Sequence, residues 1–228
     1  MIQWVVERAK RASLITRVLV ATDDRRIYDC IQESGGEVVM TPGGIPSGTD
    51  RVAHVAKDLD FEIIINIQGD EPFIEPEEVD QAARILIENE HAVMGTLVKK
   101  ITSIEELENP NTAKVVVNEK NDSLYFSRSP IPFFRNNNNM RHWLKTDIYY
   151  KHVGIYSYRK QFLLQFASWE PTHLEKSEKL EQLRVLEKGY PIKVAETDFE
   201  PFCVDTPEDL ERARQLAEQM SFSKSCRD

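Results

Sequence analysis

The sequence predicts an α/β fold organised around a doubly wound sheet. Short β-branched runs alternate with amphipathic helical segments over residues 1–90, and the links between them are short. The run at residues 61–67 is rich in isoleucine at successive positions, which is typical of a strand buried on both faces of a parallel sheet. A polar stretch, QGDEP, follows this run directly. Ligands bind at the carboxyl ends of strands in such sheets, so this stretch is the first candidate for a site.

Helical spacing of apolar residues and the positions of capping residues predict the helices. Ser47 is a good N-cap for the helix that follows it, and Thr206 caps the last helix with Pro207 in its first turn. We expect helices at residues 1–12, 25–36, 47–59, 75–90, 161–169, 178–189 and 207–220. The β-branched and aromatic runs predict strands at residues 17–22, 37–40, 61–67, 91–101, 113–118, 124–128, 152–159 and 191–196.

Length, charge and cysteine content limit the class of protein. The 228 residues indicate a single domain over residues 1–220, with a loop at the four asparagines 136–139 and a disordered tail at residues 221–228. A formal net charge of −9 disfavours wholesale nucleic-acid binding, which needs a concentrated basic surface. Three scattered cysteines without a C-x-x-C pair predict neither a zinc site nor a disulfide framework, and no apolar stretch is long enough to cross a membrane. We therefore expect a cytoplasmic protein.

Two carboxylates stand where a divalent cation could bind. Asp70 follows the isoleucine-rich strand in a bend that Gly69 loosens, and Asp205 follows another short apolar stretch directly before a helix. Mg²⁺ prefers oxygen ligands, usually one or two carboxylates completed by water and phosphate. In a doubly wound sheet both side chains can lie at one edge and form a two-carboxylate magnesium site. From spacing alone, a solvated loop at Asp70 and an ordinary helix start at Asp205 stay open as alternatives.

Other polar motifs are less specific when each is taken alone. The SGTDR motif places Arg51 at a helix start, where a base edge or an anion can bind. Arg128 lies beside a proline-fixed segment and could grip a carboxylate, and His152 and Tyr156 share one face of a strand. Helix capping, surface exposure and a structural histidine explain these residues equally well. The sequence contains no Walker loop, no G-x-G-x-x-G motif and no arrangement typical of a catalytic nucleophile.

Six motifs, taken in order, resemble one family. The motifs SGTDR, QGDEP, YFSRSPIP, HVGIYSYR, EQLR and VDTPEDL are similar to those of the 3-deoxy-manno-octulosonate (KDO) cytidylyltransferases, over residues 1–220. The resemblance implies a Rossmann-like doubly wound mixed sheet of the nucleotide-diphospho-sugar transferase type, with a small arm within residues 127–158 that forms a homodimer. It also implies transfer of a cytidylyl group from CTP to the anomeric hydroxyl of KDO, with release of pyrophosphate, for lipopolysaccharide biosynthesis.

The resemblance assigns roles to individual positions of this chain. Asp70 and Asp205 would hold Mg²⁺. The cytidine nucleotide would be bound by Ser47, Arg51 and Gln68. The sugar would be bound by Arg128, His152, Tyr156, Glu181 and Gln182, of which Arg128 and His152 would meet the KDO carboxylate. The implied mechanism is direct attack of the sugar hydroxyl on the α-phosphorus, with the metal neutralising charge in the transition state.

The start of the chain departs from the family pattern. The family opens with a strand and a basic loop of the kind IPARxxSxRLPGKPL that wraps the triphosphate, whereas Met1 aligns just after that loop. We therefore expect that the sequence begins at an internal methionine, that the neighbours of a central strand lack a partner, and that this chain binds CTP weakly and turns over poorly.

Two alternatives to this function stay open. One is a cytidylyltransferase for another acidic sugar such as sialic acid, although HVGIYSYR and EQLR favour KDO. The other is a non-catalytic nucleotide-binding or dimerisation remnant. The missing loop favours the remnant, and the presence of both Asp70 and Asp205 opposes it.

Overall fold

The computed structural model describes residues 1–135 and 140–225 of the chain. The strands are β1 (Leu19–Thr22), β2 (Glu37–Met40), β3 (Ile63–Asn66), β4 (Met94–Lys100), β5 (Lys114–Val117), β6 (Ser123–Ser127), β7 (Tyr150–Arg159) and β8 (Lys193–Glu196). The helices are α1 (Ile2–Ala9), α2 (Arg25–Glu33), α3 (Gly48–Ala56), α4 (Pro76–Glu88), α5 (Ile104–Glu108), α6 (Met140–Trp143), α7 (Lys160–Ala167), α8 (His173–Glu178), α9 (Gln182–Glu187) and α10 (Pro207–Ser225), with one 3-10 helix, η1 (Leu144–Thr146).

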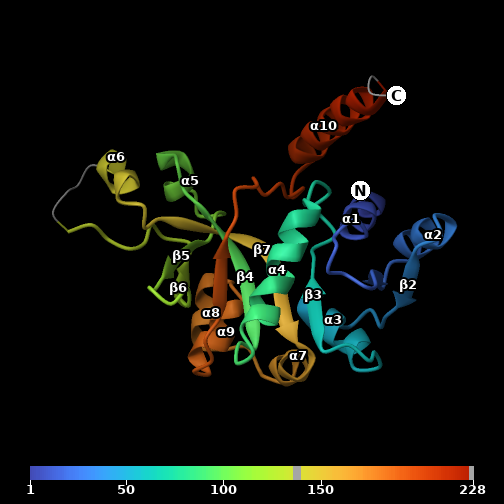
Figure 1. Ribbon diagram of the computed structural model, residues 1–228, viewed down its shortest axis with the longest axis horizontal. Helices are drawn as coiled ribbons and strands as arrows, with labels where there is room; N and C mark the ends of the chain where they lie inside the picture. Colours follow the sequence, from blue (N-terminus) through green and yellow to red (C-terminus); the bar gives the residue numbers. More distant parts are fainter. Residues whose placement is uncertain (136–139, 226–228) are drawn as a thin grey trace.

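The strands form two separate sheets (Figure 1). A six-stranded mixed sheet has the order β6–β5–β7–β4–β8, and β3 pairs with β7 beside this path. The strands β1 and β2 form a two-stranded parallel sheet of their own. The expected α/β architecture with a mixed sheet is confirmed, and the division into two sheets is its main irregularity.

The long strand β7 organises the larger sheet. One edge of β7 pairs antiparallel with β4, from Tyr150 opposite Lys100 to Tyr158 opposite Met94. The other edge pairs with β3 at its carboxyl end and with β5 at its amino end. Because β8 lies parallel to β4 on the far side, β4 and β7 have partners on both edges.

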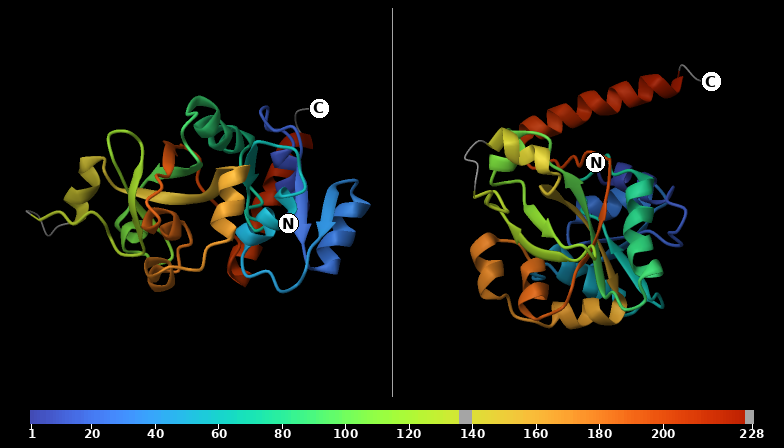
Figure 2. Two further views of the ribbon diagram at one scale, coloured as in Figure 1. Left: turned by 90° about the horizontal axis from the view of Figure 1, so that it is seen from below. Right: turned by 60° about the vertical axis from the view of Figure 1, so that its left-hand side comes forward.

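Helices cover both faces of this sheet, and the side chains of β7 alternate between them. Val153 and Ile155 pack into the apolar cluster that α4 covers. Tyr156 and Tyr158 pack into the opposite cluster, to which α3, α7 and α9 contribute. The second view of Figure 2 shows α4 and the segment containing α7, α8 and α9 on opposite sides of the strands. This alternation is the ordinary pattern of a strand buried on both faces.

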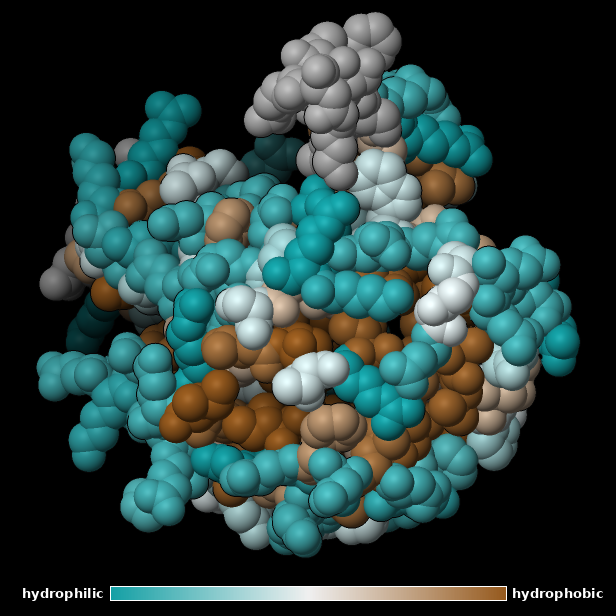
Figure 3. Space-filling view, turned by 45° about the vertical axis from the view of Figure 1, so that its right-hand side comes forward, coloured by the Kyte–Doolittle hydropathy of each residue, from teal (hydrophilic) through white to brown (hydrophobic). Residues whose placement is uncertain are grey.

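An apolar hollow, which we call the open slot, lies between β1 and β3. Within the described residues β1 pairs only with β2, and β3 pairs only with β7, so each has an unpaired edge. The open slot measures about 550 Å³ and is lined by side chains of α1, β1, α3, β3 and α4, among them Val5, Val20, Val55, Ile64 and Val79. Figure 3 shows a broad apolar area, hollowed in the middle, on this side of the molecule. The expectation that two neighbouring strands lack a partner is thus met.

Several details differ from what the sequence predicted. The segment 61–67 was predicted to form a buried parallel strand, which is wrong, because β3 runs antiparallel to its one partner and is only half-buried along the open slot. The predicted helix 178–189 begins later, at Gln182 in α9, because Lys179 adopts a left-handed conformation, with φ 55°, and ends the separate helix α8. The last helix, α10, continues to Ser225, into the segment predicted to be disordered.

Two other expectations concern the asparagine loop and the absence of a membrane-spanning segment. The asparagine loop at 136–139 lies outside the described residues, as do residues 226–228. Over the described part of the chain, none of the helices combines the length and the apolar character needed to span a bilayer.

Candidate active site

The polar segment after β3 is the centre of the candidate site. Three groups of side chains gather around it. A cluster of carboxylates and one thiol lies beyond the end of β3, the start of α3 lies beside it, and buried polar groups of β7 and α9 lie behind it. Polar side chains from three parts of the chain therefore converge on this segment.

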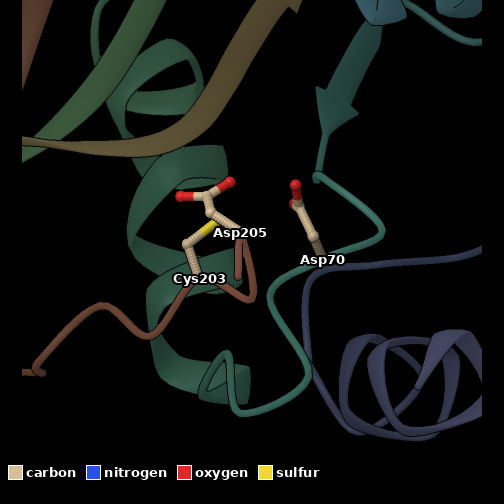
Figure 4. Close-up of side chains that lie close together, drawn as sticks. All are labelled: Asp70, Cys203 and Asp205. Atoms are coloured by element: carbon tan, nitrogen blue, oxygen red, sulfur yellow. The ribbon is translucent and has the colours of Figure 1, made fainter. Parts of the chain in front are cut away.

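Asp70, Cys203 and Asp205 form the first group, and their ligand atoms all lie within 4.8 Å of one another. Figure 4 shows the carboxylate of Asp70 facing Asp205 across a small gap, with the sulfur of Cys203 beside Asp205. The amide of Val204 donates a hydrogen bond of 3.0 Å to the carbonyl oxygen of Asp70, which ties the two chain segments together. Asp70 Oδ1 is buried and has no hydrogen-bond partner among the residues that the structure describes. An orphaned carboxylate oxygen beside a second carboxylate suits a hard divalent cation, so these residues fit Mg²⁺.

Glu71 lies directly behind this cluster. Its side chain is only 8 % exposed, and burial, followed by the charges of Asp70, Glu78 and Asp205, raises its pKa to about 8. A Cβ at position 154 would stand 2.6 Å from Glu71 Oε1, so the carboxyl group reaches β7 only because residue 154 is glycine. Glu71 therefore adds a third, buried acidic group directly behind Asp70 and Asp205.

The second group lies at the start of α3. Ser47 is the N-cap of this helix, and its Oγ accepts a hydrogen bond of 3.1 Å from the amide of Asp50. Gln68 lies against the same helix start, where a Cβ at Gly48 would come within 3.3 Å of Gln68 Oε1. Arg51 extends from α3 and forms an ion pair of 3.0 Å with Asp23. The structure thus brings the three predicted nucleotide residues to one place.

A buried chain of hydrogen bonds connects the second group to the third. Gln68 Nε2 donates to Asn66 Oδ1 at 3.4 Å, and Asn66 Nδ2 donates to Thr49 Oγ1 at 3.2 Å. The hydroxyl of Thr49 in turn donates to the carboxylate of Glu181, whose pKa is raised by burial. These hydrogen bonds therefore connect the start of α3 to the start of α9 through side chains.

The third group belongs to β7 and α9. The hydroxyl of Tyr156 donates to Gln182 Oε1 at 3.3 Å, while Gln182 Nε2 is buried without a partner. The ring of His152 packs 5.1 Å from that of Tyr156, and its Nε2 lies 2.9 Å from Thr96 Oγ1. Burial lowers the pKa of His152 to about 4, so its ring is neutral at pH 7. The unpartnered amide of Gln182 is a donor available to a polar ligand.

Arg128 is the predicted residue that the structure does not bring into this arrangement. Its Nε, Nη1 and Nη2 donate to the carbonyl oxygens of Glu178, Pro110 and Lys179, at 2.7, 2.9 and 3.4 Å. Within the described residues it forms no hydrogen bond with any other predicted site residue. Arg128 was predicted to meet the KDO carboxylate together with His152, whereas in this conformation backbone carbonyl groups engage it. Two of the three carbonyl groups, those of Glu178 and Lys179, lie at the left-handed turn that ends α8.

Sequence reasoning missed four residues that complete the site. Asn66, Thr49 and Thr96 are buried polar links between the predicted residues, and Cys203 adds a thiol beside the carboxylates. A single asparagine in an isoleucine-rich strand was the available signal for Asn66, because an unpaired buried amide is costly. Cys203 stands two positions before Asp205, a spacing that places both side chains on one side of an extended segment.

Comparisons with known proteins show which proteins this chain is similar to. A family model described as cytidylyltransferase matches residues 1–197. The 3-deoxy-manno-octulosonate cytidylyltransferase of Geotalea uraniireducens (strain Rf4) is 51% identical over 219 residues, which cover 93% of this chain and 86% of the relative. A solved CMP:2-keto-3-deoxy-manno-octonic acid synthetase, complexed with CTP, matches with a TM-score of 0.88 and 40% identity, over 96% of this chain and 88% of that one. The 4-diphosphocytidyl-2C-methyl-D-erythritol synthase of Anaerococcus prevotii DSM 20548 shares the fold at a TM-score of 0.58 and 13% identity, over 95% of this chain and 88% of that one.

Proposed function

The chain belongs to the 3-deoxy-manno-octulosonate cytidylyltransferase family, and from this premise we propose that it transfers the cytidylyl group of CTP to KDO. The products are CMP-KDO and pyrophosphate, and the activated sugar serves lipopolysaccharide biosynthesis in the cytoplasm. The observation that carries the proposal is the orphaned Asp70 Oδ1 facing Asp205, beside the start of α3. A triphosphate lying over this pair would have its base near α3 and its α-phosphorus next to the sugar residues of β7.

Asp70 and Asp205 are the residues that would hold Mg²⁺ in this site. The bound ion would neutralise the negative charge that develops on the phosphate oxygens. The two carboxylates come from segments far apart in the sequence, and the Val204–Asp70 backbone hydrogen bond fixes their relative position. Their contribution is therefore positional as well as electrostatic, because both ligands are set before the nucleotide arrives.

The start of α3 is the proposed cytidine site. Gly48 lets the helix approach Gln68, whose side-chain amide offers both a donor and an acceptor to a base edge. Arg51 is held by Asp23 and by the hydroxyl of Thr41, and 17% of its side chain is exposed. These groups recognise the nucleotide by hydrogen bonding, and they bring no nucleophile to the reaction.

The groups of β7 and α9 are the proposed sugar site. Gln182 offers an unpartnered donor, and Tyr156 and the neutral His152 add polar groups on the same side. Neutral donors suit the hydroxyl groups of a sugar. In this conformation the KDO carboxylate would be recognised by such donors, and Arg128 would reach it only after leaving the carbonyl groups that now hold it.

A sugar panel tests the proposed function. The purified chain is supplied with CTP and Mg²⁺, together with KDO, sialic acid or no sugar, and the CMP-sugar is quantified. We expect CMP-KDO in the first arm only, and none from Asp205→Asn. Glu208→Gln is the matched control, because this exposed residue lies in the same helix start and outside the cluster. CMP-sialic acid in place of CMP-KDO would identify another acidic-sugar transferase, and CTP binding without any product would favour the non-catalytic remnant.

We also propose that the arm within residues 127–158 forms a homodimer. Phe133 is 72% exposed although its ring packs 5.5 Å from Trp143, and Ile148 is 43% exposed. Exposed apolar side chains of this size on one arm are typical of an interface with another chain. Light scattering should show a dimer that Phe133→Ser weakens, while Leu124→Ser, which changes an exposed residue outside the arm, leaves it intact. A monomer at all concentrations would contradict the proposal.

A further inference from the structure

Asp205 lies at the end of a segment that has neither a helix nor a strand of its own. Residues 197–206 connect the end of β8 to the start of α10, and Figure 1 shows them running between these two elements. The first amide of the segment donates a hydrogen bond of 2.9 Å to a carbonyl group of β4, and the amide of Val204 donates one of 3.0 Å to the carbonyl oxygen of Asp70. Between these two points, side chains of the sheet hold the segment in place.

Lys151 of β7 contacts this segment through Glu200. Its Nζ donates hydrogen bonds to the carboxylates of both Glu200 and Glu106, which lies on α5. The side chain of Lys151 is only 6% exposed, so its ammonium group has left bulk water and needs these partners. Lys99 Nζ donates to the carbonyl oxygen of Asp198 at 2.5 Å, but it lies 3.8 Å from the carboxylate of Glu200. Lys151 is therefore the buried cation that holds the carboxylate of Glu200.

The strand that carries Lys151 is the fixed partner of this ion pair. At this point β7 has neighbours on both edges, because Lys151 lies opposite Lys99 of β4 and opposite Lys114 of β5. Glu200 lies in the irregular segment, and 63% of its side chain is exposed. A buried donor on a paired strand therefore sets the position of an exposed carboxylate, and the contact fixes the segment to the sheet shortly before Asp205.

We propose that Lys151 is a positioning residue for the reaction, and that its ion pair with Glu200 sets where the carboxylate of Asp205 lies opposite Asp70. The proposal rests on the proposed function, in which those two carboxylates hold Mg²⁺. Loss of a residue that orients a metal ligand typically lowers metal affinity by about 10–100-fold. The competing interpretation is that Lys151 only anchors α5 through Glu106. Substitution of each carboxylate in turn separates the two interpretations.

Hydrogen exchange of the chain without metal or nucleotide tests the geometry directly. Glu200→Gln removes the carboxylate on the segment of Asp205, and Glu106→Gln, the matched control, removes the other carboxylate from the same lysine. We expect the amide of Val204 to exchange at least about tenfold faster in Glu200→Gln, because a charge-assisted hydrogen bond to Lys151 is lost. The rate should stay unchanged in Glu106→Gln. An unchanged rate in Glu200→Gln, or an equal increase in both variants, would overturn the proposal.

Substitution of the lysine itself completes this comparison. Lys151→Met keeps the length of the side chain and removes its charge, so the amide of Val204 should exchange as fast as in Glu200→Gln. Lys151→Arg keeps a cation that can bind both carboxylates, and it should restore most of the protection. If Lys151→Met does not fold, Glu200→Gln still decides the question, because that residue is 63% exposed.

Equilibrium titration with CTP, with and without Mg²⁺, gives a second readout that needs no turnover. The factor by which Mg²⁺ strengthens CTP binding should fall about tenfold or more in Glu200→Gln, and Glu106→Gln should keep it. An unchanged factor in Glu200→Gln would overturn the role at the metal even if its segment exchanges faster, and no effect of Mg²⁺ on the unaltered chain would overturn the metal site as well. If both readouts change as expected and the unaltered chain makes no CMP-KDO, the positioning role stands and the proposed function fails.

Discussion

The two sides of the molecule differ in how completely their strands are paired. On the closed side, formed by β4, β5, β7 and β8, the central strands have partners on both edges, and Leu97 and Ile155 are fully buried. On the open side, formed by β1, β2 and β3, two strands face each other across the open slot, and Ile64 and Ile65 are only partly buried. Every buried amide or carbonyl group left unpaired along those edges costs about 1–3 kcal/mol.

The candidate site lies across the boundary between these sides. His152, Tyr156 and Gln182 belong to the closed side, where cores on both faces of the sheet fix their positions. Arg51 and Gln68 line the open slot. The proposed sugar-binding half is therefore held by packing, whereas the proposed nucleotide-binding half lies along the open slot.

The largest effect should come from the carboxylates that join the two sides. Asp205→Asn removes one of two proposed metal ligands, and we expect CMP-KDO formation to fall by about 10²–10³-fold, in the range seen when one group that stabilises transition-state charge is removed. Steady-state kinetics at saturating CTP checks this. A variant that keeps at least half of the activity would show that Asp205 does not hold the metal.

A matched pair of leucine substitutions compares the stability of the two sides. Leu97→Ala empties a fully buried position of β4 and should lower the free energy of unfolding by about 2–5 kcal/mol. Leu59→Ala changes a partly buried residue that lines the open slot, and its cost should be less than about 1 kcal/mol. Urea denaturation measures both values. Equal costs would mean that the open side is packed as tightly as the closed side.

A smaller effect should appear in the pH dependence of the free energy of unfolding, because His152 is buried on the closed side. Burial lowers the pKa of His152 from 6.5 to about 4, so the folded chain favours the neutral ring. The resulting stability is present above pH 6.5 and is lost as the pH falls toward 4, because the unfolded chain takes up the proton first. We expect a loss of up to about 3 kcal/mol across this window. Denaturation of His152→Gln over the same range should show a smaller loss, and an identical loss would contradict this origin.

The sequence predicted the helices and strands better than it predicted how the strands pair, for a physical reason. Periodicity and capping residues report local structure, so α3 with its Ser47 cap and α4 were predicted close to their observed positions. The pairing partner of β3 depends on segments distant in sequence. An isoleucine-rich strand therefore suggested a buried parallel strand, whereas β3 lies antiparallel to β7 beside a slot.

The candidate site could be predicted from the sequence only in part. Asp70 and Asp205 could be chosen because each follows an apolar run, and the structure brings them together. The engagement of Arg128 by backbone carbonyls could not be predicted, because it depends on the left-handed turn at Lys179 that ends α8. The role of Thr49 as a buried link to Glu181 was hidden by its ordinary place at a helix start.

The most direct test of the whole account is pyrophosphate release from CTP with KDO and Mg²⁺ by two proteins. One is this chain, and the other carries a strand and basic loop of the family type joined before Met1, so that a strand can fill the open slot. We predict clearly faster, KDO-dependent release from the second protein, and its loss on Asp205→Asn. Equal rates from both proteins would contradict the role assigned to the open slot, and no release from either while CTP still binds would contradict the transferase itself.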